Sequence, residues 1–206
     1  METLKYDLKL FLQDTSGVAL EDVIPVFHRW IQTRQLEELL IDVADYRHVH
    51  YGPGIILIAH DAHYALDLAD GKMGLLYSRR RETHPGRRAI RGMEERLTSV
   101  FHCALTACQH LEAEASLQGR LQFRGDEFLL RLNDRLVVPT AEVYDTLDLH
   151  LQPLLARLYP DCHVKVECVS ASATRPTVSI KAAYAASVET LLERLAADRV
   201  EAGAVS

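Results

Sequence analysis

The sequence predicts an α+β fold with a mostly antiparallel sheet and helices packed on one face. Three observations predict it: strand-like and helix-like segments are interspersed, an Asp-Gly pair at 70–71 marks a tight hairpin, and apolar residues recur every three or four positions over 87–117. The chain is expected to form two α+β halves of ferredoxin-like type over 1–118 and 119–201, with a disordered tail at 202–206, or else one continuous domain.

The composition is that of a soluble globular protein. The 206 residues are 48% hydrophobic, which is enough for a core without disulfides or structural metals, and the net charge is −6. A net negative charge argues against nucleic-acid binding, which usually requires a surplus of basic residues. Residues 1–13 lack the apolar run of a signal peptide, and no apolar run approaches the roughly 20 residues that cross a bilayer. We therefore expect a cytoplasmic protein with no membrane association.

The four cysteines show no C-x-x-C spacing. The interpretation is that they are small buried hydrophobic residues in a reducing compartment. They are Cys103, Cys108, Cys162 and Cys168.

The first half begins with a strand over 4–12, whose alternation places Lys5, Asp7 and Lys9 on the face opposite the apolar residues. A helix over 20–31 and a short buried strand over 39–44 follow. Residues 55–69 read as one long strand.

That strand is expected to turn at Asp70-Gly71 and to pair with 73–81. The register places Tyr64 opposite Tyr77 and Asp61 opposite Arg80, and both are favourable cross-strand pairs.

The long helix over 87–117 is expected to end at Gly119. A meander of short strands over 121–138 would turn at Gly125-Asp126 and at Asn133-Asp134. The remaining predicted elements are a helix over 140–159 that Pro153 kinks or splits, strands over 162–169 and 177–182, and a last helix capped by Ser187.

Four histidines lie close together in the sequence between 48 and 63, on either side of Gly52-Pro53-Gly54. A His-x-His pair on an extended segment, here His48 and His50, points both imidazoles to one side, where they can chelate zinc, iron or copper. His63 or His60 would supply a third nitrogen, and Asp61 or Asp45 would ligate the metal or orient an imidazole. The alternative is a polar strand end without a metal.

A catalytic histidine needs no metal. His60 with Asp61 or Asp42 could act as a general base. The sequence contains no G-x-S-x-G elbow, P-loop, G-x-G-x-x-G or H-E-x-x-H, so the standard nucleophile, nucleotide and zinc-protease motifs are excluded.

Arginines crowd the junction between the strand over 73–81 and the long helix. Cations at a helix N-terminus oppose the helix dipole, while the free backbone N–H groups there favour an anion. Arginines add bidentate donors for phosphate or carboxylate, so the pattern indicates an anion site. The alternative is a solvated charged loop with Arg80 paired to Asp61. The predicted binding residues are Arg79, Arg80, Arg81, Arg87 and Arg88.

Two functional hypotheses follow. In the first, the chain is a binding or accessory protein that holds a small anionic ligand, or the acidic surface of a partner protein, at the arginine junction. In the second, it is an enzyme that uses a divalent transition metal at the histidines to act on a small anionic substrate. The long helix also suggests a homo-oligomer if its outer face is apolar, and the two sites could share one cleft.

Overall fold

The computed structural model describes residues 5–15, 17, 19–50, 52–81, 92–169 and 174–201. The strands are β1 (Tyr6–Leu12), β2 (Leu40–Tyr46), β3 (Gly54–Ala59), β4 (Ala62–Asp67), β5 (Gly74–Arg79), β6 (Phe123–Leu132), β7 (Val164–Cys168) and β8 (Thr177–Ala182). The helices are α1 (Val23–Thr33), α2 (Gly92–Glu112), α3 (Ala141–Leu158) and α4 (Val188–Glu201), with short 3-10 turns at Leu20–Asp22, Ala69–Gly71 and Ala115–Leu117.

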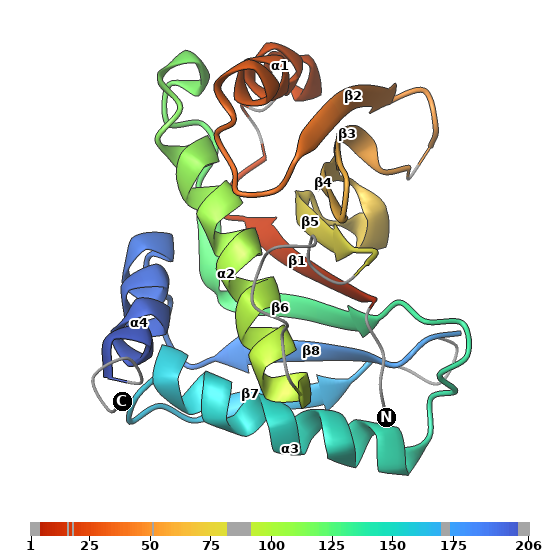
Figure 1. The fold of residues 1–206 in the computed structure, drawn as a ribbon, viewed down its shortest axis with the longest axis vertical. Coiled ribbons are helices and arrows are strands. Elements are labelled where there is room, and N and C mark those ends of the chain that lie inside the picture. The colour runs from red at the N-terminus through yellow and green to blue at the C-terminus, as the bar shows by residue number, and fades with distance from the viewer. Residues whose placement is uncertain are drawn as a thin grey trace.

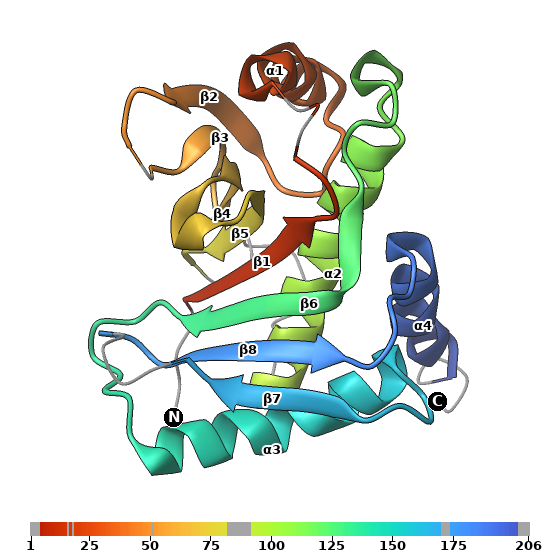
Figure 2. The ribbon, with the colours of Figure 1, turned by 180° about the vertical axis from the view of Figure 1, so that it is seen from behind.

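All eight strands belong to one antiparallel sheet in the order β2-β3-β4-β5-β1-β6-β8-β7, which confirms the predicted α+β class. β1 lies near the middle and pairs with β5 on one side and β6 on the other. α2, α3 and α4 cover one face of this sheet, and α1 packs against β2 and β3 (Figures 1 and 2). No helix in the described part of the chain is both long enough and apolar enough to span a bilayer.

The core lies between the sheet and the helices. It draws residues from before and after Gly119, including Leu8, Leu97, Phe101 and Phe128, all with no exposed surface. The buried stripe of α2 contains the predicted side chains from Met93 to Leu111. α2 ends at Glu112, short of Gly119, and the part of the predicted helix before Gly92 lies outside the described residues, as does the predicted disordered tail.

The register of the predicted hairpin is confirmed, because β4 and β5 pair with Tyr64 opposite Tyr77, but the strands are joined by a loop over 68–73 with a 3-10 turn at Ala69–Gly71 and not by a two-residue turn. The long strand predicted over 55–69 is wrong. The chain turns at His60-Asp61, so that 55–81 forms three strands, β3, β4 and β5. No glycine or proline marks this turn, and apolar residues flank it on both sides.

Three other expectations need correction. β2 is an edge strand, not a buried one, and Ile41 is 53% exposed. The meander over 121–138 is a single strand, β6, that continues through Gly125-Asp126, where its pairing with β1 shifts register, although the chain does turn after Asn133. The cysteines are free, but only Cys108 is buried; Cys103 and Cys162 are partly exposed, and Cys168 is exposed at the other sheet edge.

The helix caps agree with the sequence. Thr140 accepts a hydrogen bond from the Val143 amide at the start of α3, and Ser187 accepts one from the Thr190 amide at the start of α4. Pro153 lies inside α3, which continues as one helix to Leu158.

Candidate functional site

The predicted metal histidines are divided between the two ends of β3. His48 and His50 lie in the turn that follows β2, not on an extended segment. His60 follows the other end of β3, and His63 pairs with Ile58. Six residues of strand place these groups roughly 20 Å apart. Across the described ranges, no three His, Cys, Asp or Glu side chains lie close enough together to hold a metal ion.

His60 and Asp61 do contact each other. The Nδ1 atom of His60 is 2.6 Å from Oδ1 of Asp61, and both residues form the β3–β4 turn. A carboxylate that holds one imidazole nitrogen is the arrangement of a general base, so the catalytic prediction keeps a geometric basis. Asp61 and Arg80 are neighbours as predicted, but the contact between them is a backbone hydrogen bond. The Arg80 amide donates to the Asp61 carbonyl at 2.8 Å.

The predicted arginines separate into two groups. Arg80 and Arg81 are exposed at the end of β5, while Arg79 is buried on the helix-covered side of the sheet. This division follows from strand geometry, since successive side chains point to opposite faces. Arg87 and Arg88 lie outside the described residues.

Arg79 is held by neighbours from its own strand and from α2. Its Nε and Nη2 atoms donate to the Tyr77 hydroxyl at 3.1 and 3.0 Å, and Nη2 also donates to Ser99 Oγ at 3.0 Å. A weaker contact joins Nη2 to the sulfur of Cys103 at 3.6 Å. The guanidinium has five N–H donors in all, and among the described residues its buried Nη1 atom has no hydrogen-bond partner.

A second orphaned polar atom lies on the neighbouring strand. Tyr6 is directly opposite Arg79 in the β1–β5 pairing, and its buried hydroxyl also has no hydrogen-bond partner in the part of the chain that the structure describes. Burial raises the pKa of Tyr6 to about 12, although the positive charges of Arg96 and Arg79 act in the opposite direction. Arg96 is on α2 and is 9% exposed, so two buried cations flank one neutral phenol.

Tyr77, which accepts from Arg79, packs against a second buried tyrosine, Tyr64. The rings of Tyr64 and Tyr77 are 5.0 Å apart, and both hydroxyls donate to the Glu38 carboxylate, the Tyr77 bond being 3.1 Å. Glu38 therefore reaches Arg79 only through the Tyr77 oxygen. Within the described ranges, no carboxylate lies within ion-pair distance of Arg79.

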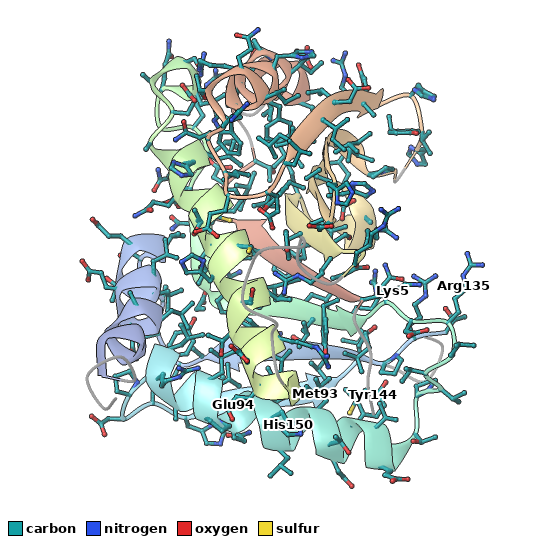
Figure 3. The ribbon with its side chains drawn as sticks, viewed as in Figure 1. Lys5, Met93, Glu94, Arg135, Tyr144 and His150 are labelled. Carbon is teal, nitrogen blue, oxygen red and sulfur yellow. The ribbon has the colours of Figure 1, made fainter. Side chains whose placement is uncertain are left out.

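The site lies where the chain passes from the sheet to the helices. Ser99 and Cys103 follow Arg96 by three and seven residues on α2, so one face of that helix meets the end of β5. Figure 3 shows the start of α2, marked by Met93 and Glu94, beside Tyr144 and His150 of α3.

The sequence identified Arg79 but missed Tyr6, Arg96 and Glu38. Strand alternation predicts Tyr6 only as a core residue, and Arg96 lies within a helical pattern that predicts packing. The β1–β5 register that brings Tyr6 to Arg79 joins residues 73 positions apart, and no local signal reveals such a pairing.

The pKa of His63, which lies on β4, tests its burial and its proximity to Arg80 at the end of β5. Burial lowers it below 6.5, and the charge of Arg80 lowers it further. The folded state then binds this proton less readily than the unfolded state. The His63 contribution to stability is therefore complete above pH 6.5 and falls as the pH drops from 6.5 through the lower folded pKa.

An NMR titration of the imidazole should give a His63 pKa below 6.5, and Arg80→Gln should raise it. Arg81→Gln is the matched control, since Arg81 is exposed and does not contribute to the shift. Urea unfolding at pH 7.5 and 5.5 should show a smaller acid loss for His63→Gln than for the parent protein. A His63 pKa at or above 6.5 would contradict the geometry.

Comparison of this chain with protein-family models, with curated proteins and with solved structures finds no match.

Proposed function

We propose that the chain is a binding protein that holds a small phosphate- or carboxylate-bearing ligand between β5 and α2, with Arg79, Tyr6 and Arg96 as its donors. The observation that carries the proposal is a pair of buried donors on adjacent strands, Arg79 Nη1 and the Tyr6 hydroxyl, for which the described residues supply no acceptor. Buried polar groups in folded proteins nearly always have partners, and an unpaired buried charge is costly. An anion would satisfy both donors at once.

The burial of Arg79 favours a small ligand over the acidic surface of a partner protein. Its side chain is 7% exposed, so a folded partner could reach Arg80 and Arg81 but not Arg79. The contacts from Tyr77 and Ser99 fix one side of the guanidinium, which leaves the Nη1 edge for the ligand. Planar donor geometry of this kind suits phosphate and carboxylate oxygens.

Thermal denaturation and calorimetry with inorganic phosphate and with citrate, at constant ionic strength, test this function. Either anion should raise the melting temperature in a saturable way. Tyr6→Phe keeps the ring packing and removes one donor to a charged ligand, so we expect about tenfold weaker binding. Arg79→Met should abolish binding.

Arg80→Gln/Arg81→Gln serves as the control, because it removes two charges at the same strand end without touching the buried donors. Binding that survives in Tyr6→Phe and is lost in this control would place the anion on the exposed arginines and overturn the proposal. No response of the parent protein to either anion would also overturn it.

A further inference from the structure

A second site lies on the other face of the sheet. The pairing registers of the strands place Lys9, Leu76 and Leu129 side by side on the face opposite Arg79. A cavity of about 220 Å³ opens there, between the central strands and the segments that precede β3 and follow β4. The residues that decide its chemistry are Asp7, Lys9, Asp67, Leu76, Leu129 and Arg131.

Lys9 is the central polar group of this cavity. It is 1% exposed, and its Nζ atom donates to Asp67 Oδ2 at 2.9 Å and to the Ala69 carbonyl at 2.5 Å. A lysine ammonium has three N–H donors, so one remains beyond these two bonds. Asp67 uses its other oxygen to accept from the Ala69 amide at 2.8 Å, which fixes the carboxylate that holds Lys9.

The acidic groups of the cavity are already occupied by donors of the protein. Asp7 accepts from Ser78 Oγ at 2.7 Å and from the Asn133 amide at 2.8 and 2.9 Å. The guanidinium of Arg131 lies 3.9 Å from Asp7, on the strand that also carries Leu129. Lys9 therefore has one N–H group left to donate to a ligand, and the positive charge of Arg131 lies nearby. The cavity favours a ligand with a hydrogen-bond acceptor over a cationic ligand.

The rest of the wall is apolar. Leu76 and Leu129 flank Lys9 on the two neighbouring strands, and both are partly exposed because the cavity separates them from other side chains. A volume of about 220 Å³ has room for a small organic acid.

We infer that this cavity binds a small monocarboxylate with an apolar body. The carboxylate accepts from the third Lys9 N–H with Arg131 nearby, and the hydrocarbon part packs against Leu76 and Leu129. This site is independent of the anion site at Arg79, since the two lie on opposite faces of the sheet and share no residue.

Calorimetry and ligand-observed NMR with butyrate, hexanoate and benzoate provide the test, with hexylamine and hexanol as comparison probes. Hexanoate should bind saturably and more tightly than butyrate. Leu129→Trp fills the cavity and should weaken hexanoate binding at least tenfold. Leu149→Trp, the same change at a 69% exposed leucine of α3, should leave it unchanged.

Tyr6→Phe should also leave hexanoate binding unchanged, which separates this site from the anion site. Hexylamine bound as tightly as hexanoate would overturn the assignment of an acceptor ligand. Absence of saturable binding to the parent protein, or equal binding by Leu129→Trp and Leu149→Trp, would overturn the site itself.

Discussion

Lys9→Met should lower the free energy of unfolding by about 3–5 kcal/mol, as expected when one partner of a buried ion pair is removed. Lys9 and Asp67 are 1% and 2% exposed, and their charged atoms are 2.9 Å apart. Methionine fills similar space but leaves the Asp67 carboxylate buried without its cation. Urea denaturation measures the change as a shift of the midpoint at constant slope.

Lys165→Met is the matched control for this experiment. Lys165 pairs with Glu167 at 2.8 Å, but both side chains are about half exposed to solvent. An exposed pair of this kind contributes less than about 1 kcal/mol, so the two substitutions should differ by several-fold in effect. The double change Lys9→Met/Asp67→Leu should recover much of the loss, because it removes both buried charges. Equal effects of Lys9→Met and Lys165→Met would contradict the buried pair.

Alternation along β1 predicted which face Lys9 would occupy, but not that this face would be covered. All seven residues of Tyr6–Leu12 are buried, whereas a two-faced strand in an antiparallel sheet usually exposes its polar side. Lys9 is buried by its contacts with Asp67 and the Ala69 carbonyl, about sixty residues away. Such coverage depends on tertiary contacts that a local pattern does not contain.

Turn chemistry explains both the success and the failure around β4. Asp70-Gly71 marks its own hairpin, because Gly71 has a φ of 72° that glycine adopts without strain. The turn at His60-Asp61 carries no such residue, so the apolar segments on either side read as one strand. The predicted metal cluster fails for a different reason, because His48 and His50 precede β3 while His60 follows its other end.

The position of the arginine-rich segment in the chain could be predicted, but the directions and neighbours of its side chains could not. The run of Arg79, Arg80 and Arg81 marks a charged strand end, and strand alternation requires that its members point to different faces. Only the tertiary structure shows that Arg79 is the inward one and that Tyr6 is its neighbour. The local sequence therefore predicts a positively charged strand end, whereas the pairing of β1 with β5 determines that Arg79 and Tyr6 lie together.

Gly125→Ala should lower the free energy of unfolding by about 3 kcal/mol, at the upper end for overpacking. The sequence interpreted Gly125 as a turn residue, but it lies inside β6. A Cβ atom there would be 1.9 Å from the Ala186 carbonyl oxygen, which belongs to the backbone and cannot rotate away. The Gly125 carbonyl also accepts a hydrogen bond from the buried Tyr159 hydroxyl, so a backbone shift would disturb that bond as well.

The sign of this effect separates close packing from intrinsic strand preference. Glycine within a strand is less favourable than alanine by roughly 0.5–1 kcal/mol, so a position with open space would gain stability from the same change. Gly17→Ala is the control, because the nearest atoms to its Cβ would be those of Arg120 at 3.8 and 3.9 Å, which is ordinary contact. A Gly125→Ala protein as stable as Gly17→Ala would mean that β6 and the segment before α4 are farther apart than the structure places them. A large loss confined to Gly125→Ala would establish that the absence of a side chain at this position lets the α4 connection pack directly on the sheet.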